Sequence, residues 1–339
     1  MNTGDLTQRG RRLLGLWIVS LLAAPAVANN YQLSVLTMLL WFAYVGQAWN
    51  VMMGFAGQLS LGHSLYVGLG AYASAALFVH FGIGPWAGLW AGVAVAALAG
   101  AAIGVLGFRF GVHGVYFALL TIAFAEITRV AFDHIGWLGG SGGFFLPVSR
   151  HLTSNLADLR GPPAMFYYII LALTLAALLL CRWLLARRTG YYWQAIREDQ
   201  EAAQALGIKV FRYKLAAVVI SAAMTAIGGV FHAFYYNNLF PEEIFSVSRS
   251  IEILLGAVIG GIGTLFGPIL GAFALTALGE LLTWGLDHAG IAVPGAKQFA
   301  YGGALVAIVI FAPSGIWPLL ARRLGLIQIP AKPLPKPAS

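Results

Sequence analysis

Long apolar stretches separated by short polar connections make up most of the chain. A membrane-spanning helix needs about 20 predominantly apolar residues. Ten stretches approach or reach that length: 13–29, 33–53, 61–81, 85–107, 113–132, 164–186, 214–236, 250–265, 267–286 and 297–318. The pattern therefore predicts an all-α polytopic membrane protein of about ten spans. It places a transmembrane domain at residues 13–320, with polar terminal segments at 1–12 and 321–339.

The eighth and ninth stretches form the weakest part of this prediction. About 35 residues are short for two crossings, and the turn from Gly260 to Pro268 is rich in residues that interrupt helices. We therefore expect broken or half-length helices here and a range of eight to ten spans. Non-helical backbone at membrane depth persists only where protein or a watery cavity covers it. Four glycines are assigned as hinges of this turn: Gly260, Gly261, Gly263 and Gly267.

Composition and charge support a membrane location. Only 9% of the 339 residues are charged, against about 25% in soluble proteins. Of the 20 basic residues, 14 lie in the N-terminus, the 182–214 insert and the C-terminal tail. This clustering is typical of cytoplasmic segments and not of a nucleic-acid-binding surface. We therefore expect cytoplasmic termini and an external loop at 133–163.

The N-terminal segment and the single cysteine limit which processing and which cysteine chemistry the chain can undergo. The N-terminal arginines, an apolar run and Ala26-Val27-Ala28 imitate a cleavable signal peptide, although the many later spans favour retention. Cys181 is the only cysteine, which excludes an intrachain disulfide and a cysteine metal cluster. No metal site is predicted.

The polar insert at 187–213 is expected to be a cytoplasmic loop containing one helix from Tyr192 to Leu206. The spacing places four apolar residues on one face of this helix: Trp193, Ile196, Ala203 and Leu206. Gly207, which follows them, suits a helix end. Glu201-Ala202-Ala203, followed after three residues by Gly207, matches the EAA-x3-G motif of ABC importer permeases. In that family the motif helix seats in a groove of the ATPase. An ordinary alanine-rich loop helix also fits this loose pattern.

Further similarity occurs in stretches that keep one order along the chain: 57–63, 116–129, 139–143, 195–207, 255–268 and 313–316. On these stretches, within residues 33–318, the chain resembles the branched-chain amino-acid ABC permease family, in particular its LivM-type subunits. The resemblance assigns coupling to an ATPase to seven residues of the insert: Arg197, Glu198, Asp199, Glu201, Ala202, Ala203 and Gly207.

The resemblance also implies partners. A phosphate-binding loop needs a Gly-Lys pair, and none occurs in the chain. We therefore expect no enzyme activity and no bound cofactor, with ATP and Mg²⁺ used by two separate ATPase subunits. A second homologous permease and an extracytoplasmic substrate-binding protein are implied in a bacterial inner membrane. The expected cargo is amino acids, branched-chain ones first. Urea or short amides, carried by the same family, and an ion-coupled secondary transporter remain alternatives.

Ionisable residues within the spans are the candidates for the transport pathway. Glu126 and Arg129 lie one helical step apart; they either form a structural ion pair or line the path of a zwitterion. Three more pathway candidates begin the third span: Gln58, Ser60 and His63. Helix capping by Ser60 is the alternative there. His232 and Glu280 are lone polar groups, and His232 is expected to be packed.

Glycine patterns predict two further features. A ridge of small residues at four-residue spacing runs along the fourth span: Gly88, Gly92, Ala96, Gly100 and Gly104. Such a ridge permits close helix contact, either internal or between subunits. The segments 54–59 and 260–265 share a GxxGxL pattern, of the kind that a duplicated transporter leaves. The external glycines at 139–143 are expected to be a gate, a docking surface or a flexible linker.

Overall fold

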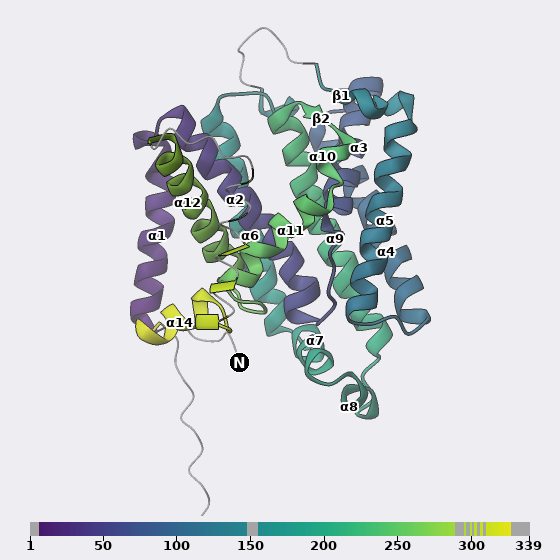
Figure 1. The fold of residues 1–339 in the computed structure, drawn as a ribbon, viewed down its shortest axis with the longest axis vertical. Helices are drawn as coiled ribbons and strands as arrows, with labels where there is room; N and C mark the ends of the chain where they lie inside the picture. Colours follow the sequence, from purple (N-terminus) through teal and green to yellow (C-terminus); the bar gives the residue numbers. More distant parts are fainter. Residues whose placement is uncertain are drawn as a thin grey trace, which may run out of the picture.

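The computed structural model of the chain describes residues 7–147, 155–288 and 310–326, with a few single residues between 295 and 307. Its long helices are α1 (Gln8–Val27), α2 (Asn30–Asn50), α3 (His63–Phe81), α4 (Pro85–Arg109), α5 (Val115–His134), α6 (Pro163–Ala186), α9 (Val210–Tyr236) and α12 (Gly267–His288). Apart from α12, these helices stand side by side in one bundle (Figure 1). A π-helical turn, Val51–Phe55, extends α2.

Shorter elements lie at the two ends of the bundle and between the long helices. They are α7 (Arg188–Glu198), α8 (Gln200–Ala205), α10 (Pro241–Ile244), α11 (Val247–Gly260), α14 (Ile316–Arg323), and the paired strands β1 (Phe144–Phe145) and β2 (Asn238–Leu239). The strands run antiparallel, with Phe144 opposite Leu239. Figure 1 shows α7, α8 and α14 at one end and the strands at the other.

Eight helices of the described residues are long and apolar enough to cross a membrane. They coincide with predicted spans one to seven and nine. The predicted stretch at 250–265 contains a half-length helix, the broken form that the sequence indicated, because α11 ends at Gly260 after 14 residues. A helix of that length is about 21 Å long, shorter than a hydrocarbon core of about 30 Å. Gly261, at φ +125°, turns the chain away from the helix. The tenth predicted span, 297–318, lies mostly outside the described residues.

The first and last described segments meet at the end of the bundle that carries α7 and α8. The backbone N–H of Thr7 donates to the carbonyl oxygen of Leu326 at 3.0 Å, and its hydroxyl donates to that of Gly325 at 2.9 Å. The two segments therefore lie together at one end of the bundle. This agrees with the expectation of two termini on the same side, whose cytoplasmic identity stays a prediction from charge.

The glycine ridge of α4 is buried against α3 and α9. A Cβ added at Gly92 would lie 2.9 Å from the carbonyl oxygen of Gly70 on α3. One added at Gly100 would lie 2.9 Å from the Cβ of Ala222 on α9. Small residues let these backbones approach closely, which drives helix association in lipid. The ridge is thus internal packing, the first of the two alternatives.

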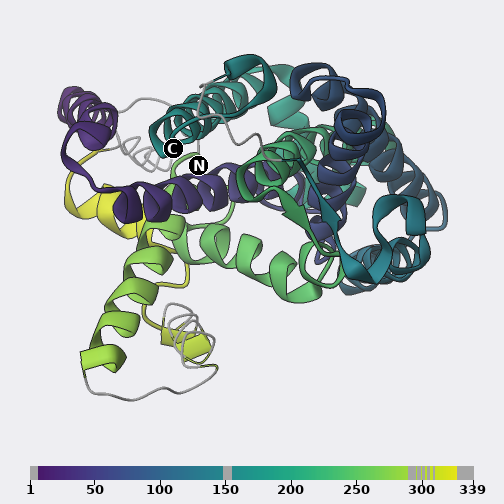
Figure 2. The ribbon, with the colours of Figure 1, turned by 90° about the horizontal axis from the view of Figure 1, so that it is seen from above.

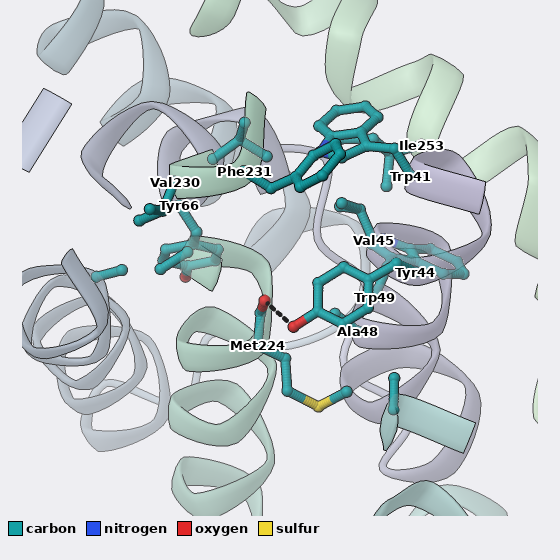
Figure 3. Close-up of a cluster of buried hydrophobic side chains, with 14 of the residues drawn as sticks. Trp41, Tyr44, Val45, Ala48, Trp49, Tyr66, Met224, Val230, Phe231 and Ile253 are labelled. Atoms are coloured by element: carbon teal, nitrogen blue, oxygen red, sulfur yellow. Dashed lines mark hydrogen bonds between the residues drawn. The ribbon is translucent and has the colours of Figure 1, made fainter. Parts of the chain in front are cut away.

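Aromatic side chains of α2 form the centre of the core. The Trp41 indole N–H donates to the carbonyl of Gly228, and the Tyr44 hydroxyl donates to that of Met224, both at 2.8 Å. Figure 3 shows Tyr44 reaching across from α2 to α9. Each bond pairs a polar group that lipid would leave unsatisfied.

By contrast, α12 runs out from the bundle (Figure 2), and its Leu281 and Trp284 are exposed.

Candidate functional site

The insert at 187–213 contains two helices instead of the single predicted one. Asp199 adopts φ −154° and ψ 110° between α7 and α8, which breaks the helix. Its carboxylate accepts the backbone N–H groups of Glu201 and Ala202 at 2.9 and 3.0 Å, so it caps α8. An aspartate that bonds nearby backbone in this way competes with continuous helix. Gly207 follows at φ +83°, the left-handed conformation typical of a glycine beyond a helix end.

The break at Asp199 divides the apolar residues of the loop between two environments. Trp193, Ile196 and Ala203 are buried, as predicted. The Trp193 indole donates to the Tyr213 carbonyl at 2.7 Å and fastens α7 to α9. Leu206, predicted on the same face, is instead 82% exposed.

Most of α8 is exposed; within it, only Ala203 is buried. Glu201 and Ala202 on this helix and Leu206 directly after it are exposed, and Glu198 at the end of α7 is exposed as well. A short helix with an exposed acid, a small residue and an exposed leucine suits insertion into a groove of a partner.

Arg197 connects the buried side of the loop to the membrane helices. Its guanidinium donates to the carbonyl oxygen of Gly54, in the turn after α2. It also lies over Gly263 in the turn between α11 and α12, where a Cβ would collide with it. A Cβ added at Gly57 would lie 2.9 Å from the Arg197 Cγ. One side chain of α7 thus touches both glycine turns.

The two GxxGxL turns lie against each other, joined by Asn50. The Asn50 amide donates to the carbonyl of Thr264 at 2.9 Å and accepts the N–H of Gly263 at 2.8 Å. The internal sequence echo therefore corresponds to two turns that meet in space. Asn50 was missed from sequence, where it is only a polar residue at the end of an apolar stretch.

The four predicted hinge glycines allow close backbone contact between α11 and α12. Gly261 and Gly263 have φ of +125° and +74°. A Cβ at Gly260 would collide with the carbonyl of Gly267, so the two helices pack backbone against backbone. Thr264 holds the turn, because its hydroxyl donates to the Gly261 carbonyl at 2.7 Å. The hinge role stays a prediction.

A chain of charges follows one side of α5. Arg129 contacts Glu126 at 2.6 Å and Asp133 at 2.8 Å. Asp133, missed from sequence, keeps one buried carboxylate oxygen without a partner among the described residues. The Glu126 side chain is 48% exposed. Neighbouring apolar side chains of α5 are exposed too, including Tyr116 and Ile127. Glu126 therefore belongs to an open face of the chain, whereas Asp133 is mostly covered.

A second ionic cluster lies on the elements that pack beside α5. Arg249 of α11 contacts Glu243 of α10 at 2.9 Å and Glu252 of α11 at 3.2 Å. Arg249 and Glu252, within the weak eighth span, were not singled out from the sequence. Their i, i+3 spacing on a helix was the available signal.

The other pathway candidates are buried inside the chain. His63 contacts the hydroxyls of Ser60 at 3.1 Å and Ser221 at 2.9 Å. The N-cap of α3 is Gly62, and Ser60 provides no cap of its own. The Gln58 amide donates to the Ala56 carbonyl at 2.8 Å. In this conformation these residues fasten the start of α3, and their pathway role stays a prediction.

The two lone polar groups of the spans differ in their surroundings. Glu280 accepts the Tyr31 hydroxyl at 2.7 Å, which links α12 to α2. His232 is packed between the rings of Trp41 and Tyr236. No group of His, Cys, Asp and Glu suited to a metal occurs within the described residues.

The glycine segment at 139–143 and the turn before it are closely packed where the structure describes them. The turns Gly136–Leu138 and Gly140–Gly142 are 3₁₀-helical. A Cβ at Gly143 would collide with the ring of Phe240, and His80 stacks on Trp137 with ring centroids 4.4 Å apart. These contacts favour a built surface over a loose linker.

Comparison with known sequences identifies the family. Residues 31–314 match the family described as the permease component of the branched-chain amino acid transport system. This chain belongs to that family. The permease is 30% identical to the high-affinity branched-chain amino acid transport system permease protein LivM of Escherichia coli K12, over 94% of this chain and 78% of the relative. It is 29% identical to LivM of Salmonella typhimurium, over 97% and 80% of the two chains.

A more distant similarity reaches a different transport system. The permease is 29% identical to the autoinducer 2 import system permease protein LsrC of Klebsiella pneumoniae, over 56% of this chain and 53% of the relative. No solved structure matches. The permease is thus a multi-pass protein of the bacterial inner membrane, an ABC transporter permease of the branched-chain amino acid type, and a transport component instead of a catalytic enzyme.

Proposed function

We propose that this permease is the membrane-spanning subunit of an ATP-driven importer for amino acids, with leucine, isoleucine and valine as its first substrates. The similarity to LivM proteins along nearly the whole chain supports the cargo. One structural observation carries the ATP-driven mechanism. The α7–α8 loop exposes Glu201 on the surface of the chain, and it contacts the turns at Gly54 and Gly263 through Arg197.

The proposed coupling runs from α8 into the membrane. Two separate ATPase subunits hold ATP and Mg²⁺, and α8 seats in a groove of one of them. When the ATPases close, α8 moves, and α7 moves with it. Arg197 then shifts the turns at Gly54 and Gly263, which join α2 to the α11–α12 pair. Asn50 keeps these two turns together, so they move as one unit.

The translocation pathway is proposed to lie along the charged face of α5, against a second homologous permease. A charge at the centre of a lipid-facing helix costs about 2.5–3.5 kcal/mol on insertion scales. The half-exposed Glu126 would incur this free-energy cost if the chain stood alone in lipid. A partner permease and a watery path between the two chains would remove it. The ammonium of an amino acid would then meet Glu126 or Asp133, and its carboxylate would meet Arg129.

The proposed function is tested by reconstituting the permease with its ATPases, partner permease and binding protein in proteoliposomes. We expect leucine uptake that depends on ATP, and substrate-stimulated ATP hydrolysis. Glu201→Arg should abolish both while the variant remains inserted. Arg323→Glu, a charge reversal at the same end of the bundle, serves as the matched control and should retain uptake.

Three results would contradict the proposal. Uptake by the purified permease alone, driven by an ion gradient, would indicate a secondary transporter. Competition of uptake by urea or acetamide but not by leucine would change the cargo. Normal uptake by the Glu201 variant would remove α8 from the coupling mechanism.

A further inference from the structure

A basic pocket lies beside α8, outside the contacts used by the coupling mechanism. It has a volume of about 450 Å³ and opens between α8, the start of α9 and the last turn of α4. Three cations line it, Lys209, Arg212 and Lys214, together with Phe108 and Phe211. No acidic residue is part of this lining.

The three cations have no carboxylate partner within the described residues. Lys214 is 4% exposed. Its ammonium donates to the Gln200 side chain of α8 at 2.8 Å and lies 4.7 Å from the centre of the Phe108 ring. Both contacts are with neutral groups. Like charges gathered in one pocket repel one another, so an anion placed between them would be stabilised.

The position of the pocket narrows the kind of anion. Phe108 lies next to the last residue of α4, and Lys209 is the N-cap of α9. Both helices are candidate membrane spans, so the pocket is at the level where lipid headgroups meet water. Its lining combines cations with the aromatic rings of Phe108 and the partly exposed Phe211. This combination suits an amphiphile with a negative headgroup and an apolar tail.

We propose that this pocket binds the headgroup phosphate of an anionic phospholipid. Basic pockets between spans at the cytoplasmic side are suited to such headgroups. The phosphate lies between Lys209 and Arg212, above Lys214, and the first acyl carbons lie along Phe211. Because Gln200 of α8 holds Lys214, a lipid in the pocket would contact the helix that carries Glu201.

The test measures lipid affinity of the full-length permease in detergent by native mass spectrometry. Phosphatidylglycerol and phosphatidylcholine are titrated separately. The double variant Lys209→Gln/Arg212→Gln is expected to lower phosphatidylglycerol affinity by roughly tenfold to thirtyfold, from about 1 kcal/mol for each basic residue. Its phosphatidylcholine affinity should not change. Arg322→Gln/Arg323→Gln removes the same charge from α14 and should keep phosphatidylglycerol affinity within about twofold of the parent.

Lys214 provides a second readout, because its removal affects the same pocket from below. Lys214→Arg keeps the charge and should retain lipid affinity. Retained affinity would show that a substitution in this pocket leaves the permease folded. Unchanged phosphatidylglycerol affinity in the double variant would overturn the proposal, as would equal affinity for the two lipids. Displacement of the lipid by inorganic phosphate at equal concentration would show that a soluble anion is the ligand. Loss of ATPase co-purification with unchanged lipid affinity would assign the pocket to an acidic protein surface.

Discussion

Replacing Arg197 with alanine tests the link between the cytoplasmic loop and the membrane turns. The substitution removes the guanidinium that donates to Gly54 and covers Gly263. It leaves the Trp193 bond to Tyr213 and the Asp199 cap of α8 intact. The loop should therefore keep its fold and lose its contact with the turns, together with the exposed ion pair of Arg197 with Glu198 at 3.0 Å.

The size of the effect follows from the contact. A hydrogen bond that involves a charged group contributes about 1.5–3 kcal/mol. The Arg197 side chain is 36% exposed, so water can replace part of the interaction, and we take the lower value. About 1.4 kcal/mol corresponds to a factor of ten. Arg197→Ala should therefore reduce coupling about tenfold. Arg197→Lys keeps the charge but cannot reach both turns with a planar fork, and should be intermediate.

The assay is the number of leucine molecules imported for each ATP hydrolysed by the reconstituted complex. We expect that ratio to fall about tenfold while basal hydrolysis and co-purification of the ATPases persist. Arg188→Ala, in the first turn of the same helix, is the control. An unchanged ratio would refute the relay through Arg197. Loss of the ATPases from the complex would instead make Arg197 a docking residue.

Three further substitutions test the packing and the membrane charges. Gly260→Ala should destabilise the permease by roughly 3 kcal/mol or more, because the added Cβ would collide with Gly267. Size-exclusion chromatography should then show a lower yield of folded permease. Gly285→Ala should leave that yield unchanged, because a Cβ there has nothing within 4 Å. Arg129→Ala should abolish leucine uptake by leaving two carboxylates unpaired, with uptake partly kept in Arg129→Lys; normal uptake in the alanine variant would exclude a pathway role. Tyr44→Phe should lower the thermal stability by about 1 kcal/mol without changing transport, which thermal unfolding measures.

The spans were predictable because each depends on the sum of many apolar side chains. Hydropathy located α1 to α6, α9 and α12 without knowledge of any contact. Helix α11 was not predictable in the same way. Its apolar residues continue beyond Gly260 in sequence, but the backbone turns at Gly261 because α12 packs closely against it. The glycines and the proline of the turn indicated a broken helix, but the residue at which α11 ends depends on this tertiary contact.

The loop shows a similar limit at the level of single residues. Apolar spacing correctly placed Trp193 and Ile196 on a buried face. The same spacing failed for Leu206, because one capping aspartate, Asp199, restarts the helix in a new direction. Asn50 was unpredictable for another reason. Its partner Thr264 lies 214 positions later, and nothing near Asn50 in the sequence indicates that contact.

The burial of α2 has a consequence for biosynthesis. This helix leaves the ribosome early, yet the partners of Trp41 and Tyr44 follow 187 and 180 positions later. Each unpaired polar group in hydrocarbon costs several kcal/mol. A nascent chain that stops before α9 therefore holds α2 in an unfavourable setting. Early α2 must wait beside the insertion machinery or a chaperone until α9 is synthesised, and chains truncated before α9 should be degraded.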